Sequence, residues 1–228
     1  MSLAVANYHD VYECFPPAYV ADENGQPMHS WRVLVLPFLS DHYASQTYDA
    51  YDFSEPWNGP NNSLLIGKRP PVFGLYGGDN EGSHTNYLAV VGKDTVWPFA
   101  ESASYKDVRD GTSNTIMFVE NVGSGIAWTE PRDLNIDTMS MTIDDDPADG
   151  ISSWLQPPGV AMADGSMRAL DLAMTASELR SMLVKNDGQG VGGKATEMQD
   201  GRNRPMRGIQ KVGPDPSGSD GGVGELDR

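Results

Sequence analysis

The amino-acid sequence predicts an α+β fold in which a helix opens the chain and an antiparallel sheet forms late. A helical repeat of apolar residues occupies residues 3–15, and apolar, partly β-branched runs follow residue 85. The two kinds of segment do not alternate along the chain. Because a doubly wound fold needs alternating strands and helices, segregated elements favour α+β. Proline, glycine and asparagine are frequent between the elements, so we expect long loops.

The first predicted helix covers residues 3–15. Its apolar residues recur at steps of four, three and four and therefore share one face; they are Ala4, Tyr8, Val11 and Phe15. Pro16 and Pro17 end the helix, since proline lacks an amide hydrogen and clashes with the preceding turn. No loop with a capping residue marks the start of this helix.

The next stretch of the chain has weaker signals. The pair Asn24-Gly25 marks a turn. Ser30 is placed to cap a short helix over residues 31–39, although the valines in it would also suit a strand. The composition of residues 51–62 predicts a loop, and a further short helix is predicted over residues 63–67.

Strands are predicted in the second half of the chain. Residues 85–91 and 114–122 are apolar runs bounded by glycines. Residues 159–170 read as a β-hairpin, in which Asp164-Gly165 suits a type I′ turn. Neighbouring strands joined in this way pair antiparallel, so the late sheet is predicted to be antiparallel.

Two capping boxes mark further helical starts. Ser104 and Asp107 have the required spacing, and Gly111 can end that single turn. Thr175, with Glu178 three residues later, predicts a helix that runs to Val184.

The domain organisation follows from a change in composition near residue 186. Residues 186–228 are rich in glycine and contain no aromatic residue, so they hold too little apolar surface to offset the entropy of ordering. We therefore expect a globular head over residues 1–185 and a flexible tail over residues 186–228.

The composition excludes several classes of function. The formal net charge is −16, which opposes binding to nucleic acid and docking on anionic lipid. The single cysteine, Cys14, rules out an internal disulfide framework. The chain contains no run of 18 apolar residues, the length that a membrane-spanning helix needs.

Motifs for catalysis or metal binding are weak. The four histidines are not paired at metal-binding spacing, and there is no G-x-S-x-G elbow. The glycine-rich residues 77–82 lack the Lys-Ser/Thr ending of a P-loop. An acidic loop could hold calcium through Asp144, Asp145, Asp146 and Asp149, but we favour a solvated loop, since the EF-hand pattern is absent. Glu120, Glu130 and Asp133 could serve as acid and base. We expect no enzyme and no cofactor beyond this possible calcium.

Several quoted segments occur together in one order and carry a resemblance: "NYHDVYECFPPAYV", "SWRVLVLPFL", "YDFSEPWNGPNN", "TNYLAVVG", "DVRDGTSNTIMFVE", "WTEPRDL" and "VAMADGSMRAL". Over residues 3–185 the chain resembles the planctomycete pilin-like, or pseudopilin, family of unknown function (domain of unknown function 1559, formerly labelled a bacterial solute-binding family). The motif residues that carry the resemblance are Tyr8, His9, Asp10, Phe15, Pro16, Gly111, Thr112, Ser113, Asn114, Asp164 and Gly165.

The resemblance implies a pilin-like fold, with the N-terminal helix packed on the late sheet through Ala4, Tyr8, Val11 and Phe15. It also implies an apolar helical half ahead of this segment, which would anchor the natural precursor in the inner membrane. The expected function is that of a structural subunit of a type II secretion or type IV pilus-like assembly in the cell envelope. Its expected partners are other pilin-like subunits, which it would meet through that helix, and nucleic acid is not among them.

A second function remains open, namely an extracytoplasmic module that binds a carbohydrate or another solute. Exposed tryptophans would suit stacking on sugars, and the candidates are Trp57, Trp97, Trp128 and Trp154; burial in the core is the competing interpretation. Trp154 also stands where the resembled family usually carries a histidine ahead of the terminal hairpin, so any role of that histidine is in doubt here.

Overall fold

The computed structural model describes residues 1–75, 82–144, 148–188 and 195–197. Its main sheet consists of β3 (Tyr87–Val91), β4 (Ile116–Glu120), β5 (Leu134–Asn135), β6 (Gly159–Met162), β7 (Met167–Leu170) and β8 (Ala195–Glu197). The strand order is β5-β3-β4-β6-β7-β8. All neighbours pair antiparallel except β3 and β5, which are parallel. The late sheet is therefore mixed, and the α+β class is confirmed.

The helices precede most of the sheet in the chain. The α-helices are α1 (Ser2–Tyr12), α2 (Trp31–Leu34), α3 (His42–Asp49) and α4 (Ala176–Leu183). Short 3₁₀ turns are η1 (Leu36–Phe38), η2 (Asn62–Leu65), η3 (Pro71–Phe73) and η4 (Tyr105–Asp107). A separate two-stranded ribbon consists of β1 (Tyr19–Ala21) and β2 (Pro27–Ser30).

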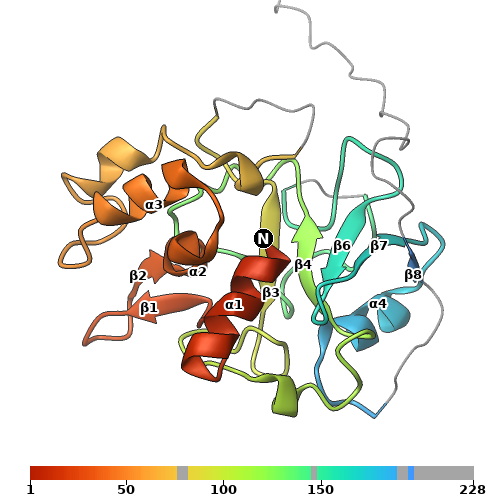
Figure 1. Cartoon of the computed structure of the whole chain (residues 1–228). Helices are drawn as coiled ribbons and strands as arrows, with labels where there is room; N and C mark the ends of the chain where they lie inside the picture. Colours follow the sequence, from red (N-terminus) through yellow and green to blue (C-terminus); the bar gives the residue numbers. More distant parts are fainter. Residues whose placement is uncertain (76–81, 145–147, 189–194, 198–228) are drawn as a thin grey trace, which may run out of the picture.

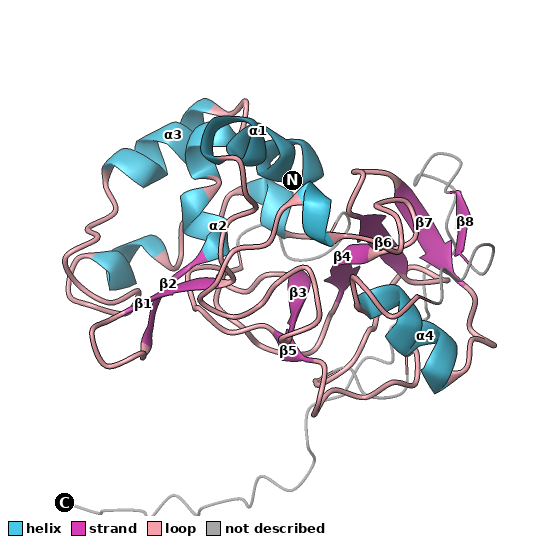
Figure 2. Cartoon of the chain, turned by 90° about the horizontal axis from the view of Figure 1, so that it is seen from below, coloured by secondary structure: helices cyan, strands magenta, loops and turns pink. Residues whose placement is uncertain are grey.

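Helices cover both faces of the sheet. Figure 1 shows α1 crossing in front of the strands, and Figure 2 shows α1 and α4 on opposite sides of them. Strand β3 alternates between the two sides: Ala89 belongs to the apolar cluster around α1, and Leu88 to the cluster around α4. All five residues of β4 are buried, as expected of a central strand covered on both faces.

Helix α1 ends three residues earlier than predicted, and this changes which side chains it buries. Glu13 adopts a left-handed conformation with φ of 60°, and its amide donates to the His9 carbonyl at 2.8 Å. Phe15 is fully buried, but it lies beyond the helix, where its amide donates to the Ala103 carbonyl. Val11 is 62% exposed, so its predicted packing on the sheet is wrong. Val5 takes a buried place on the inner face beside Ala4.

The segment around Ser30 is helical, as predicted, but interrupted. The Ser30 hydroxyl accepts from the Arg32 amide at 3.3 Å, and α2 then gives way at Val35 to the turn η1 that contains Pro37. The sequence prediction missed α3, although Asp41 caps it by accepting from the Tyr43 amide at 3.0 Å. It also missed strands β1 and β2, which flank the predicted turn at Asn24-Gly25.

The hairpin of β6 and β7 is confirmed, but its turn is not of type I′. A type I′ turn needs positive φ at two consecutive residues, and here Gly165 has φ of 86° whereas Asp164 does not have a positive φ. The Gly165 amide donates to the Met162 carbonyl, and the Met162 amide donates to the Ser166 carbonyl. This pattern is a three-residue loop with glycine in the left-handed position.

Both capping boxes form, at Ser104 with Asp107 and at Thr175 with Glu178. The head predicted over residues 1–185 lies within the described parts except for residues 76–81 and 145–147. Of the predicted tail over residues 186–228, β8 pairs with β7 and thus joins the sheet. Residues 189–194 and 198–228 of that tail, and residues 77–81 of the glycine-rich stretch, lie outside the described residues.

Candidate functional site

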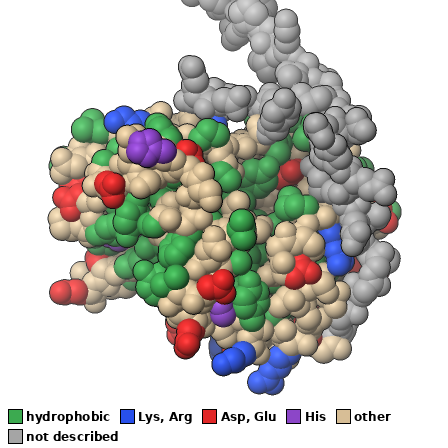
Figure 3. Space-filling view, in the orientation of Figure 1, with side chains coloured by type: hydrophobic (Ala, Val, Ile, Leu, Met, Phe, Trp, Pro, Cys, Tyr) green, Lys and Arg blue, Asp and Glu red, His purple; other side chains and the backbone are tan. Residues whose placement is uncertain are grey.

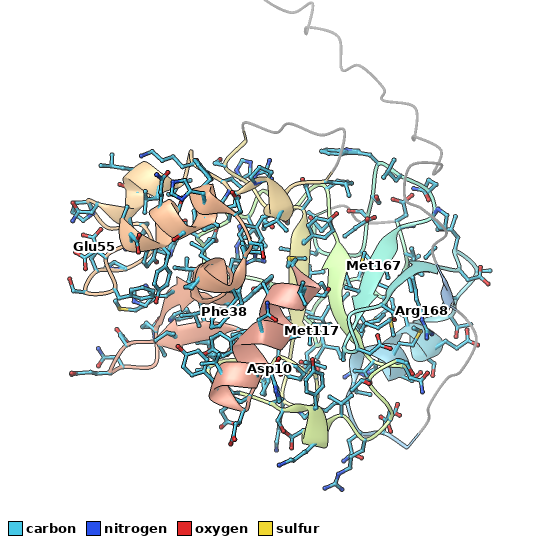
Figure 4. All side chains as sticks on the ribbon, in the orientation of Figure 1. Asp10, Phe38, Glu55, Met117, Met167 and Arg168 are labelled. Atoms are coloured by element: carbon cyan, nitrogen blue, oxygen red, sulfur yellow. The ribbon has the colours of Figure 1, made fainter. Side chains whose placement is uncertain are left out.

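Segments from three distant parts of the chain meet at one groove beside α1. This groove, called the α1 groove below, has a volume of about 230 Å³. It is lined by Ser2, Leu3, Val5 and Ala6 of α1, by Tyr105 and Met117, and by Ala163, Asp164 and Gly165 of the hairpin turn. Figure 4 labels Met117 beside α1, and Met167 and Arg168 on the neighbouring strand β7.

His9 packs the C-terminal end of α1 against Tyr105 and Phe15. Its ring lies 4.3 Å from the ring of Tyr105 and 5.1 Å from that of Phe15, centroid to centroid. Its Nε2 also accepts from the Tyr105 amide at 3.4 Å. Burial raises the pKa of Tyr105, so the phenol stays neutral. His9 therefore acts as a packing residue between a helix and a loop that are 96 residues apart.

The neighbouring motif residues of α1 divide between packing and exposure. Tyr8 is half-buried and contacts the ring of Phe38 edge-on at 5.5 Å. Asp10 is on the exposed side of the helix (Figure 4). Pro16 is buried directly after the helix, where it helps to turn the chain into the core.

The segment Gly111–Asn114 forms a tight loop that supports the hairpin. Gly111 has φ of 97°, a conformation that favours glycine. The Asn114 amide donates to the Gly111 carbonyl at 2.9 Å, and the Asn114 side chain donates to the Asp110 carbonyl. The Thr112 carbonyl accepts from the Asp164 amide at 3.0 Å, which ties this loop to the hairpin turn. Ser113 is half-buried within the loop.

Asp164 and Gly165 shape the turn that faces the first turn of α1. Asp164 Oδ1 accepts from the amide of Ser166 and from its hydroxyl, at 2.9 and 2.6 Å. A Cβ atom added to Gly165 would lie 3.8 Å from the Ser2 Cβ, so the turn and the helix are neighbours. Together the motif residues hold α1 across the sheet.

The predicted calcium ligands are only partly described. The Asp144 carboxylate accepts from the Gln156 amide group at 2.9 Å, and Asp149 is exposed. Asp145 and Asp146 lie outside the described residues. Within the described part of the chain, no group of three or more His, Cys, Asp or Glu side chains is arranged to hold a metal ion.

The three carboxylates considered as acid and base each have separate partners. Glu120 is buried and accepts from the Gly159 amide at 2.8 Å. Glu130 pairs with Arg132 at 2.6 Å near the surface. Asp133 pairs with Arg32, a contact that the sequence analysis did not anticipate. These contacts give each carboxylate a structural role.

The Arg32–Asp133 pair joins the N-terminal helices to the sheet. Both side chains are buried, at 0% and 2% exposure, and the two groups are 2.5 Å apart. The same carboxylate accepts from the Trp31 indole at 3.2 Å and from the Ala89 amide at 2.8 Å. Burial raises the pKa of Asp133 to about 6, because desolvation outweighs the lowering effect of Arg32 and these donors. An arginine inside the apolar run "WRVLVLPFL" was the available signal, because a buried charge needs a partner.

The tryptophans considered for sugar stacking fall into two groups. Trp97 and Trp128 are fully buried, as the interpretation of core tryptophans predicted, so their rings offer no surface for stacking. Their indole groups donate to backbone carbonyls, that of Trp97 to Met117 at 2.8 Å. Trp57 and Trp154 are half-buried and keep part of their surface exposed.

Comparison with known proteins matched one family model over part of the chain and no individual protein. Residues 1–73 match the model of a family described as a protein of unknown function (DUF1559). A search of curated proteins and a search of solved structures found no match. Among the described residues, every helix is too short or too polar to span a bilayer.

Proposed function

We propose that this chain, whose residues 1–73 match the DUF1559 family model, is a structural, pseudopilin-like subunit of a type II secretion or type IV pilus-like assembly. It acts in the cell envelope, outside the cytoplasm, and its partners are other pilin-like subunits. The role is mechanical and needs no catalytic site.

The observation that carries this proposal is the placement of α1. The helix crosses one face of the sheet (Figure 1), and its inner side is buried through Ala4 and Val5. Three apolar side chains near the two ends of the helix remain exposed, Leu3 at 69%, Val11 at 62% and Tyr12 at 56%. A helix that packs on its own sheet and leaves apolar side chains exposed near its ends is suited to contact a neighbouring subunit through them.

The surface around α1 supports a contact of this kind. Figure 3 shows hydrophobic side chains running across the middle of the face that contains α1. The exposed Met167 side chain of β7 lies on the same side of the sheet (Figure 4). Because the chain carries a net charge of −16, like subunits repel each other over most of their surfaces. A contact through the exposed apolar side chains of α1 offers attraction where most of the surface repels.

Photo-crosslinking in the native organism tests the proposal. A photoreactive phenylalanine derivative at Val11 is expected to form crosslinks to pilin-like subunits, identified by mass spectrometry. The matched control carries the same group at Leu64, which is 70% exposed and lies in η2, away from α1 in the sequence. The proposal fails if Val11 gives no crosslinks beyond those of Leu64, or only crosslinks to unrelated proteins.

A further inference from the structure

A second pocket, distant in sequence from α1, lies where three loop segments meet. It has a volume of about 250 Å³ and is called the Trp154 pocket below. Its walls include His84, Thr85 and Asn86 before β3, residues 122–125 after β4, and Trp154. The motif residues that hold α1 in place contribute nothing to it.

Hydrogen bonds made by Asn86 and Asn121 hold the walls of this pocket together. The Asn121 amide donates to the Asn86 carbonyl at 2.9 Å, and the Asn86 side chain donates to the Asn121 carbonyl at 3.2 Å. Asn121 Oδ1 accepts from the amides of Gly123 and Ser124, at 3.1 and 2.8 Å. The Asn121 side chain also donates to the Gly150 carbonyl at 2.7 Å, close in sequence to Trp154. The pocket is therefore formed before any ligand arrives, which lowers the entropic cost of binding.

The chemistry of the lining favours an uncharged, hydroxyl-rich ligand. Among the described residues that line the pocket there is no Asp, Glu, Lys or Arg, although the chain as a whole is strongly acidic. Trp154 supplies a half-exposed aromatic surface, and His84 is exposed at the rim. Ser124 lines the pocket, and its hydroxyl is buried and has no hydrogen-bond partner among the described residues.

We propose that the Trp154 pocket binds a neutral carbohydrate, with the indole of Trp154 stacked against the apolar face of one sugar ring. Sugars combine an apolar face of C–H groups with a rim of hydroxyls, and this matches an aromatic wall bordered by polar groups. Because the described lining carries no charged side chain, it does not favour an anionic or a cationic ligand over a neutral sugar.

Indole NMR signals test the proposal on the unmodified protein. The chain contains five tryptophans, so labelling with ¹⁵N-tryptophan gives one indole signal for each. Maltose, cellobiose and chitobiose serve as neutral probes, with glucuronic acid and glucosamine as charged comparisons. At least one neutral probe is expected to shift the Trp154 signal saturably, while the Trp57 signal stays in place. Trp57 is the internal control, because it is also half-buried and does not line the pocket.

Two variants test the stacking itself. Trp154→Ala is expected to weaken binding about tenfold, as the loss of one aromatic contact predicts, and Trp154→Phe is expected to retain most of it. The proposal is overturned if no neutral probe shifts the Trp154 signal, or if only the charged sugars do. It is also overturned if folded Trp154→Ala binds as well as the unmodified protein; should that variant not fold, the indole signals of the unmodified protein decide.

Discussion

At the scale of single residues, two buried polar side chains depend on contacts that cross the molecule. The guanidinium of Arg32 donates to Asp133, to the Ser30 hydroxyl and to the Tyr87 carbonyl. His29 is 4% exposed, and its Nδ1 lies 3.0 Å from the Tyr51 hydroxyl. In both cases a polar group is tolerated in the core because it has a partner there.

Removing one member of the Arg32–Asp133 pair should be strongly destabilising. Asp133→Ala leaves a buried guanidinium without its counter-ion, and we expect the free energy of unfolding to fall by about 3–5 kcal/mol. Urea denaturation measures this change. Arg132→Ala is the matched control, because the Arg132 side chain is 55% exposed, and its loss should cost within about 1 kcal/mol. Equal effects of the two substitutions would contradict the structural role of the buried pair.

His29 should make stability depend on pH. Burial lowers its pKa below the ordinary value of 6.5, and this outweighs the raising effect of Asp52. Below that pH the unfolded chain binds a proton at His29 more readily than the folded chain does. The stability contributed by the neutral side chain is therefore complete above about pH 6.5 and decreases as the pH falls below it.

Denaturation midpoints measured between pH 7.5 and 5.5 check this prediction. The unmodified protein is expected to lose more stability over this interval than His29→Gln, in which the titrating group is absent. His42→Gln serves as the control, since His42 is exposed on α3, and its curve should follow that of the unmodified protein. Parallel curves for the unmodified protein and His29→Gln would refute the assignment.

At the scale of elements, the hairpin of β6 and β7 depends on one glycine. Gly165 has φ of 86°, in a region that side chains with a branched Cβ resist. The turn it makes aligns Ala161 with Met167 and brings Asp164 to the loop Gly111–Asn114. An altered turn would therefore disturb both the sheet and the wall of the α1 groove.

Gly165→Val is expected to lower the free energy of unfolding by about 1 kcal/mol or more. Gly67→Val provides the comparison, because a Cβ atom at Gly67 meets no atom within 4 Å and its φ is not positive. Thermal or urea denaturation of the two variants separates backbone strain from the effect of an added side chain. An unchanged midpoint for Gly165→Val would show that the turn does not require glycine.

At the scale of the whole molecule, an acidic head carries an apolar helix on one face. Long-range repulsion from a net charge of −16 opposes self-association at low salt. The exposed side chains of α1 are few, and a stable interface between proteins buries about 1,200 Å² or more. The contacts that α1 can make are therefore too small by themselves to hold two copies of the chain together.

Light scattering of the isolated chain is accordingly expected to give the mass of one chain at low salt and at high salt. Salt screens the repulsion between carboxylates, so the high-salt measurement isolates the apolar contribution. Val11→Glu adds a charge at an exposed position of α1 and should leave this monomeric mass unchanged. Filaments formed by the chain alone at either salt concentration would contradict the expectation that the contacts of α1 are too small by themselves.

Features that depend on residues close together in the chain could be predicted from the sequence alone. The capping boxes at Ser104 and Thr175, the strand over 116–120 and the hairpin around Gly165 follow from caps, apolar runs and turn residues a few positions apart. The α+β class follows from the order of these elements. The family resemblance also came from short motifs, and the match of residues 1–73 to the DUF1559 model supports it over that part of the chain.

The side chains that these elements bring together could be identified only in the three-dimensional structure. The left-handed residue Glu13 ended α1 early, so Phe15 enters the core from the following loop, while Val11 in the last turn of the helix stays exposed. Arg32 and Asp133 are 101 residues apart, and no local pattern pairs them. The burial of Trp128 and the half-exposure of Trp154 likewise depend on how distant loops pack. The physical reason is that burial and ion pairing arise from contacts between distant segments, whereas caps and turns arise from neighbours in the chain.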